Sequence, residues 1–293
     1  MSLQKYPGPE LPALEPGKLL AGKTAVVTGG ADGIGGATTQ LLAEAGASVV
    51  FVDIDEDLAL AREASVAAAG GRAVAVVGDI CDEAVIDRVR GAAEREAGGA
   101  VDVLVNNVGD YKPYKRFLES SESDWSVQHD ICLLHVLRCV RAFLPAMVHR
   151  GSGAVVNVST VEAFRGIPGN AVYSAYKSAI VNFTRSLAVE VGGHGVRVNA
   201  IAPDLTHTPQ TPMYDWHPDQ ENVRCWVPLG RFASPVEQAR VVLFLASELA
   251  SFVTGQTLCV DGGTSAASGW YKTNPAADVW SNTPYMVAPK QGG

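Results

Sequence analysis

The sequence predicts an α/β fold: a doubly wound parallel sheet covered by helices on both faces, in three layers and a single domain. Short apolar runs rich in β-branched residues recur along the chain, and Ala-rich stretches with helical periodicity separate them. No linker divides this alternation between residues 21 and 265. Because crossovers between parallel strands are right-handed, few topologies remain for such a chain.

Six apolar runs are the expected strands. Each is continuous instead of alternating with polar residues, which is typical of parallel strands buried on both faces. The runs span residues 24–27, 48–52, 73–77, 103–105, 154–158 and 196–201. The expected helices span roughly residues 34–45, 56–69, 82–97, 124–149, 173–191 and 235–248.

Composition and charge exclude several classes of protein. The chain of 293 residues is 47% hydrophobic, which is enough for a full core, and its net charge of −8 disfavours nucleic acid and anionic membranes as partners. The five cysteines are odd in number and never spaced as CxxC, so neither a disulfide framework nor a metal site is expected. With neither a signal peptide nor an uncharged run of about 18 residues, a cytoplasmic location is the expectation.

A glycine-rich turn directly follows the first expected strand and opens the first expected helix. Glycines there permit a tight turn and let backbone N–H groups approach a pyrophosphate at the helix N-terminus, as in a Rossmann-type sheet. A purely structural turn is the alternative, but the strand before it and the helix after it favour dinucleotide binding. The residues expected to bind the cofactor here are Thr28, Gly29, Asp32, Gly33, Ile34 and Gly35.

Asp53 ends the second expected strand, 18 residues after Gly35. A carboxylate at this place accepts hydrogen bonds from the adenosine ribose and repels a 2′-phosphate, which predicts NAD as the cofactor instead of NADP. No Arg occupies the neighbouring positions 30–32 or Ile54, the next residue expected at the cofactor. The alternative is that Asp53 is a solvated acid that caps the turn before Asp55.

Several motifs in order resemble the classical short-chain dehydrogenase/reductase family over about residues 20–265. They are the glycine turn, the run Asn106-Asn107-Val108-Gly109, the run Tyr173-Ser174-Ala175-Tyr176-Lys177, and Thr254-Gly255-Gln256 followed by Val260-Asp261-Gly262-Gly263. The resemblance implies further cofactor-binding residues: Asp79, Ile80, Asn106, Val108, Gly109, Pro203, Thr206 and Thr208. It also implies a homotetramer and a substrate lid over residues 204–231, between a Pro-rich extension (1–20) and an aromatic extension (266–293).

Tyr173 and Lys177 lie four residues apart and therefore on one face of a helix. An ammonium near a phenol favours the phenolate, so Lys177 is expected to lower the pKa of Tyr173 and make it a general acid/base. The resemblance implies that Lys177 also binds the nicotinamide ribose and that a hydroxyl thirteen residues before Tyr173 orients the substrate. That position is Thr160, with Ser159 as the substitute. Tyr176 has no Lys four residues later.

The chain departs from the family at two positions. Counting seven residues from Trp125 places Cys132 where the family has a catalytic Asn, which puts the proton relay to Lys177 in doubt. Asp204 replaces the Gly that follows the family's Pro, so a Gly-like φ at Asp204 would be strained.

The expected function is an NAD-dependent interconversion of a secondary alcohol and a ketone, with no metal. The alternatives are a non-catalytic dinucleotide-binding regulator, favoured by Cys132 and Asp204, and an epimerase or lyase on the same fold. The aromatic residues of the lid suggest an apolar or ring-containing substrate, or packing against the aromatic extension or a neighbouring subunit. The extension itself is a candidate cover for a neighbour's active site.

Overall fold

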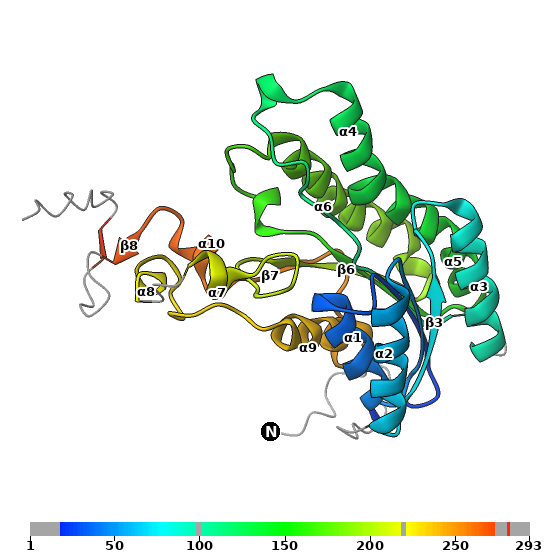
Figure 1. Cartoon of the computed structure of the whole chain (residues 1–293). Coiled ribbons are helices and arrows are strands. Elements are labelled where there is room, and N and C mark those ends of the chain that lie inside the picture. The colour runs from blue at the N-terminus through cyan, green and yellow to red at the C-terminus, as the bar shows by residue number, and fades with distance from the viewer. Residues whose placement is uncertain (1–17, 98–100, 218–220, 273–279, 282–293) are drawn as a thin grey trace, which may run out of the picture.

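The computed structural model describes residues 18–97, 101–217, 221–272 and 280–281. Seven parallel strands form one sheet in the order β3-β2-β1-β4-β5-β6-β7, with helices on both faces (Figure 1). The strands are β1 (Thr24–Thr28), β2 (Ser48–Asp53), β3 (Arg72–Val77), β4 (Val103–Asn106), β5 (Gly153–Val158), β6 (Val196–Pro203) and β7 (Thr257–Val260). The expected three-layer α/β fold is confirmed.

Two differences from the expected elements are informative. The seventh strand, β7, has only four residues, of which three are half-buried and Cys259 is exposed, so it lacks the long apolar signal of the central strands. The helix expected at 124–149 is three segments: α4 (Glu122–His129), a π-helical turn (Asp130–Leu134) and α5 (His135–Arg150). The other main helices are α1 (Gly33–Glu44), α2 (Glu56–Ala68), α3 (Glu83–Ala97), α6 (Ala171–Val191) and α9 (Pro235–Ala246).

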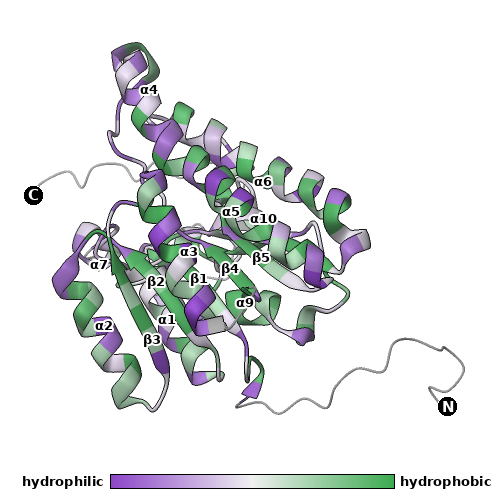
Figure 2. Ribbon diagram, turned by 90° about the vertical axis from the view of Figure 1, so that its right-hand side faces the viewer, coloured by the Kyte–Doolittle hydropathy of each residue, from purple (hydrophilic) through white to green (hydrophobic). Residues whose placement is uncertain are grey.

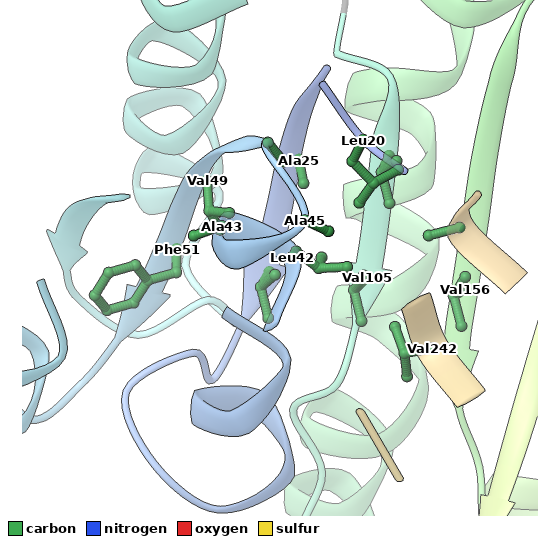
Figure 3. Close-up of a cluster of buried hydrophobic side chains, with 14 of the residues drawn as sticks. Leu20, Ala25, Leu42, Ala43, Ala45, Val49, Phe51, Val105, Val156 and Val242 are labelled. Carbon is green, nitrogen blue, oxygen red and sulfur yellow. The ribbon is translucent and has the colours of Figure 1, made fainter. Parts of the chain in front are cut away.

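The sheet separates two hydrophobic cores. One contains buried side chains of α1, α2 and α9, including Leu42, against strand residues such as Phe51 and Val156 (Figure 3). The other joins α3, α5 and α6 to the opposite face. Figure 2 shows apolar strands between helices whose outer faces are more polar. Leu20 is also buried in the first core, so the end of the expected N-terminal extension (1–20) packs with the sheet; its prolines lie outside the described residues.

The continuous helical stretch Glu122–Arg150 is long and apolar enough, by length and composition alone, to cross a membrane. Core helices of soluble proteins pass the same test, and in α5 the side chains of Val136, Phe143 and Met147 are buried in the second core. The apolar character of α5 is therefore accounted for by its packing under the sheet.

Chain direction fixes where ligands can bind. From β1 the chain continues to β2 and β3 on one side, and then returns to place β4 on the other side of β1. The chain therefore leaves β1 and β4 toward opposite faces of the sheet, and open α/β sheets bind ligands at the carboxyl ends of strands at such a reversal. Every expected site residue after a strand lies at this edge.

Replacing Leu42, which is fully buried, by Ala should destabilise the protein by about 2–5 kcal/mol because a cavity remains in the first core. The measurement is urea unfolding followed by circular dichroism. Leu118→Ala is the matched control, since Leu118 is 96% exposed and its loss should change stability by less than about 0.5 kcal/mol. Equal effects at the two positions would contradict the described core.

Candidate active site

The glycine turn after β1 has the tight geometry that its sequence predicts. Gly29 and Gly33 have positive φ values of 64° and 56°. A Cβ atom on Gly35 would lie 1.8 Å from the carbonyl oxygen of Gly29, so only glycine fits there. Asp32 is the N-cap of α1, and its Oδ1 accepts a hydrogen bond of 2.7 Å from the Gly33 amide.

Asn107 joins this turn to the end of β4. Its Nδ2 donates to the carbonyl oxygens of Thr28 (2.9 Å) and Gly29 (3.1 Å). In return, the Thr28 hydroxyl oxygen accepts hydrogen bonds from the amides of Asn107 and Val108. Asn107 was not among the expected site residues, although the doubled Asn in the motif could have drawn attention to it. The side chain of Asn106 instead donates to Asn157 at 2.8 Å inside the protein.

Asp53, at the end of β2, is bound to the glycine turn. Its Oδ2 accepts a hydrogen bond of 3.0 Å from the Ala31 amide, and its Oδ1 accepts one of 3.3 Å from the Asp55 amide. The carbonyl of Ala31 accepts a 3.0 Å hydrogen bond from Arg62 Nε on α2. Sequence reasoning missed Arg62 because it inspected only the residues adjacent in sequence. Ile54, the residue after Asp53, is 73% exposed.

The loop after β3 places Asp79 and Ile80 differently. Asp79 is exposed, and its Oδ1 accepts a hydrogen bond of 2.9 Å from the Cys81 amide. Ile80 is buried in the second core, so its side chain supports the loop. Only its backbone remains available to a ligand at the sheet edge.

Lys177 is buried, and its Nζ donates a hydrogen bond of 3.0 Å to the carbonyl of Val158 at the end of β5. The same atom lies 5.9 Å from the centre of the Tyr173 ring, one helical turn earlier in α6. A Cβ atom on Gly109 would lie 2.6 Å from Nζ, so the loop after β4 passes the ammonium too closely for a larger residue. The structure therefore brings together three groups expected from the sequence.

The expected lowering of the Tyr173 pKa does not occur in the protein alone. Burial, the largest cause, raises the pKa of this phenol well above its usual value, and a polar interaction with the Thr160 side chain opposes the rise only weakly. Burial also lowers the pKa of Lys177. Desolvation thus outweighs the attraction between the Lys177 ammonium and a Tyr173 phenolate, and Tyr173 is a protonated phenol at neutral pH.

The two candidate hydroxyls are separated by their orientation. Ser159 Oγ donates to the backbone carbonyl of Lys177 at 2.9 Å and is buried, so it fastens β5 to α6. Thr160 interacts with Tyr173, and its Oγ1 lies 3.4 Å from the carbonyl oxygen of Pro203. Thr160 is therefore the hydroxyl that adjoins the phenol.

Cys132 lies inside the π-helical turn and is fully buried. Its Sγ donates to the carbonyl of Asp110 at 3.2 Å, which joins the helix to the loop after β4. Its charged form would interact with both Tyr173 and Lys177, so Cys132 adjoins the expected catalytic pair. Burial raises the pKa of Cys132, so the thiol is neutral at physiological pH. π-Helical turns are frequent at functional sites.

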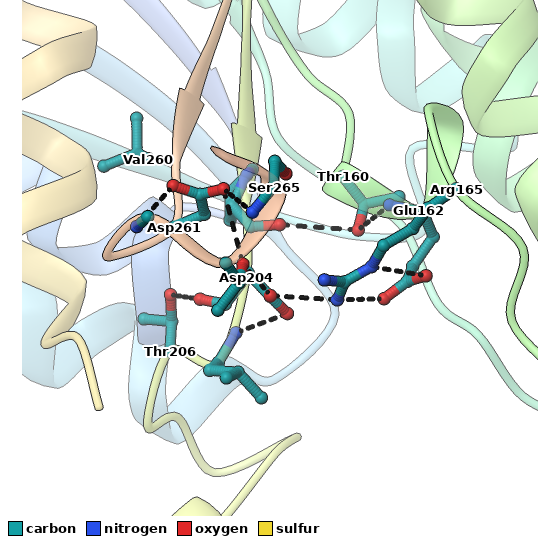
Figure 4. Close-up of polar contacts among 12 residues, drawn as sticks. Thr160, Glu162, Arg165, Asp204, Thr206, Val260, Asp261 and Ser265 are labelled. Atoms are coloured by element: carbon teal, nitrogen blue, oxygen red, sulfur yellow. Dashed lines mark hydrogen bonds and ion pairs between the residues drawn. The ribbon is translucent and has the colours of Figure 1, made fainter. Parts of the chain in front are cut away.

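The strain expected at Asp204 lies instead at the next residue. Leu205 has a φ of +31°, whereas Asp204 is not in the left-handed region. The Asp204 carboxylate accepts hydrogen bonds from the Leu205 amide (2.9 Å), from Thr264 Oγ1 (2.6 Å) and from Arg165 (2.9 Å). Figure 4 shows this cluster, with Glu162 on the other side of the Arg165 guanidinium. The substitution of Gly by Asp is thus accommodated by partners from three loops.

The segment after β6 crosses the edge of the sheet. Thr206 follows Pro203, and its Oγ1 donates to the Asp204 carbonyl at 2.8 Å. Thr208 lies against the glycine turn, with its Cβ 3.7 Å from the position of a Cβ on Gly33. Gln210 Nε2 donates to the Gly109 carbonyl at 3.3 Å. Sequence reasoning missed Gln210, whose polar side chain in a loop gives no distinctive signal.

The aromatic residues of this segment pack mainly on one another. Met213, Val223, Val227 and Phe232 form a third small core, against which Leu205 and Trp226 pack. Ring contacts join Phe232 to Tyr214 and Trp226. Packing is thus the better explanation of these side chains than a ring-containing substrate. Beyond them, α8 (Val223–Trp226) contacts β8 (Tyr271–Lys272), which pairs with β9 (Trp280–Ser281), while Tyr285 lies outside the described residues.

These residues fit a nicotinamide dinucleotide. The glycine turn presents backbone without side chains at the N-terminus of α1, and a Cβ would close the approach at Gly109. Asp53 is hydrogen-bonded to the turn, Asn107 joins the turn to the loop after β4, and Gly109 of that loop adjoins Lys177, so the residues form a continuous series along the sheet edge. Among the described residues, no group of three or more His, Cys, Asp or Glu side chains could hold a metal ion.

Comparisons with known proteins agree with this arrangement. Residues 29–265 match the family model described as enoyl-(acyl carrier protein) reductase. Cis-4-hydroxycyclohexanecarboxylate dehydrogenase of Sinomonas cyclohexanicum is 41% identical, covering 85% of this chain and 99% of its own. The 3-oxoacyl-(acyl-carrier-protein) reductase of Thermotoga maritima is 36% identical, covering 83% and 98%.

A crystal structure from Beutenbergia cavernae, described as an NAD(P)-dependent gluconate 5-dehydrogenase with bound NADP, is 36% identical with a TM-score of 0.77. It covers 86% of this chain and 100% of its own. The extent of these matches, together with the site geometry, shows that the chain belongs to the short-chain dehydrogenase/reductase family and is an oxidoreductase that acts between alcohol and ketone.

Proposed function

We propose that this protein oxidises a secondary alcohol, or reduces the corresponding ketone, with NAD as the cofactor. The observation that supports it most directly is the meeting of Tyr173, Thr160 and Lys177 at the carboxyl ends of the central strands. When bound, the cofactor supplies or accepts the hydride. The protein must then position the reacting oxygen and move one proton.

Thr160 and Tyr173 are the proposed catalytic residues at the substrate oxygen. Two hydroxyls that interact with each other can both hydrogen-bond one carbonyl oxygen, which fixes its orientation. In reduction, the Tyr173 phenol donates its proton to that oxygen; in oxidation, the phenolate accepts it. Lys177, held by the Val158 carbonyl, is placed to bind ribose hydroxyls and to stabilise the phenolate.

Cys132 is proposed as a positioning residue. Its hydrogen bond to the Asp110 carbonyl joins the π-helical turn to the loop that passes Lys177. The two departures that suggested a non-catalytic regulator, Cys132 and Asp204, both have well-formed partners in the structure. The enzymatic proposal is therefore compatible with both residues.

The preference for NAD rests on Asp53, whose carboxylate would repel a 2′-phosphate. The bound NADP in the Beutenbergia cavernae structure and the nearby Arg62 guanidinium make this preference a point to be measured.

We further propose a cytoplasmic homotetramer. All five cysteines are free thiols, as expected in a reducing compartment. Val127 on α4 and Val189 on α6 are 56% and 84% exposed, which suits contact with another subunit.

Tyr173→Phe should lower turnover by about 10²–10⁴-fold because it removes the proton donor and leaves the ring. Binding of NADH, measured by nicotinamide fluorescence, should not change. Tyr176→Phe is the matched control three residues later on the same helix and should retain full turnover. Retained turnover in Tyr173→Phe would exclude the assigned role.

Purified protein should bind NADH about tenfold more tightly than NADPH, or more so, because juxtaposed like charges are costly. Asp53→Asn should reduce this difference in affinity between NADH and NADPH. Asp57 is an exposed acid nearby, and Asp57→Asn should leave the difference unchanged. Thermal midpoints at matched ligand concentrations provide the measurement. A preference for NADPH in the unchanged protein would refute the NAD assignment while leaving the reaction class intact.

The raised pKa of Tyr173 gives the two directions different pH profiles. Below that pKa the phenol is protonated, so ketone reduction should vary little between pH 6 and 8. Alcohol oxidation needs the phenolate and should rise with pH, by up to about tenfold per unit. Initial rates in both directions at saturating cofactor test this. If the rates of both reduction and oxidation were independent of pH, proton transfer by Tyr173 would be contradicted.

A further inference from the structure

Arg165 is held between two carboxylates at the carboxyl edge of the sheet. Its Nη2 donates at 2.9 Å to Glu162 Oε1 and at 2.9 Å to Asp204 Oδ2, and its Nε lies 3.4 Å from Glu162 Oε2. The Asp204 side chain is only 8% exposed and also accepts from Thr264. The guanidinium is thus fixed in place before any ligand binds (Figure 4).

This cluster adjoins the groups proposed to handle the reacting oxygen. The Glu162 amide lies 3.4 Å from Thr160 Oγ1, and Thr160 also contacts the carbonyl of Pro203, the residue before Asp204. The charge of Glu162 raises the pKa of Tyr173, although less than burial does. The guanidinium is therefore anchored to Glu162, two residues after Thr160, and to Asp204, the residue after Pro203.

Arg165 retains unused donors. A guanidinium has five N–H groups, of which Nε and Nη2 provide three. Nη1 makes no hydrogen bond to any residue that the structure describes, and the side chain is 40% exposed. Arg165 therefore keeps two N–H donors on a partly exposed guanidinium whose other donors are already paired.

The local charge decides what these donors can bind. Two carboxylates, those of Glu162 and Asp204, already pair with this single guanidinium, so the local charge is negative in excess. A carboxylate or phosphate at Nη1 would meet this excess of negative charge. A carbonyl or hydroxyl oxygen would gain a charge-assisted hydrogen bond without that repulsion.

We propose that Arg165 determines substrate specificity by donating from Nη1 to a second, uncharged oxygen of the substrate. The substrate class is then a diketone, hydroxyketone or diol, in which one oxygen reacts at Tyr173 and the other binds Arg165. This inference rests on the proposed function and specifies its substrate.

The experiment compares kcat/KM for cyclohexanone, 1,4-cyclohexanedione and 4-oxocyclohexanecarboxylate, each with NADH and with NADPH. The unchanged enzyme should prefer the dione to cyclohexanone by roughly tenfold or more, the effect of one hydrogen bond to a charged donor. The anionic ketone should be the poorest of the three substrates.

Arg165→Met should abolish the preference for the dione while retaining turnover of cyclohexanone. Because it leaves Glu162 and Asp204 facing one another, the variant Glu162→Gln/Arg165→Met/Asp204→Asn is measured beside it and should behave alike. Arg72→Met, which breaks an ion pair with Glu96 at the far edge of the sheet, is the control and should keep the preference.

The outcomes separate this inference from the function on which it rests. Turnover without preference for the dione, or a preference that survives in both Arg165 variants, overturns the inference alone. Preference for the anionic ketone that depends on Arg165 overturns it in favour of a carboxylate site. No turnover of any of the three ketones overturns the inference together with ketone reduction.

Discussion

The hydrogen bonds between Thr28 and Asn107 hold the two halves of the site together. They join β1 to β4, where the order of the strands reverses, and they fix the glycine turn against the loop that contains Gly109, which adjoins Lys177. Without them, the glycine turn and the loop after β4 would each be positioned independently. With them, both segments are held in fixed positions on one sheet.

Burial explains the chemistry of the site as much as charge does. Lys177 and Tyr173 lie one helical turn apart on α6. Desolvation nevertheless raises the pKa of Tyr173 and lowers that of Lys177, and so favours the neutral form of each. A bound ligand that brings positive charge into this buried site would therefore lower the pKa of Tyr173 more than Lys177 does alone. In the protein alone, Tyr173 therefore carries the proton that the proposed ketone reduction requires.

The fold was largely predictable from the sequence because continuous β-branched runs and helical periodicity are local signals. The positions of Thr28, Asp53, Tyr173 and Lys177 at the ends of strands or on α6 were also predictable, because motif spacing places them, while their roles remain proposals. Arg165, Arg62 and Gln210 were not, because they meet the site through contacts between distant loops. The position of the strain, at Leu205 instead of Asp204, depended on hydrogen bonds from Arg165 and Thr264 that no spacing reveals. The edge strand β7 was not predicted, because a short strand that is only partly buried does not need the continuous apolar run that marks the central strands.

The small core of Met213, Val223, Val227 and Phe232 has an evolutionary consequence. It shares no residue with the two cores that hold the sheet, so substitutions within it leave the side chains that pack on the seven strands in place. Selection can therefore change this segment while the strands and the residues at their ends stay the same. If the segment is the substrate lid that the sequence predicts, directed evolution toward new alcohols would begin with residues 204–231.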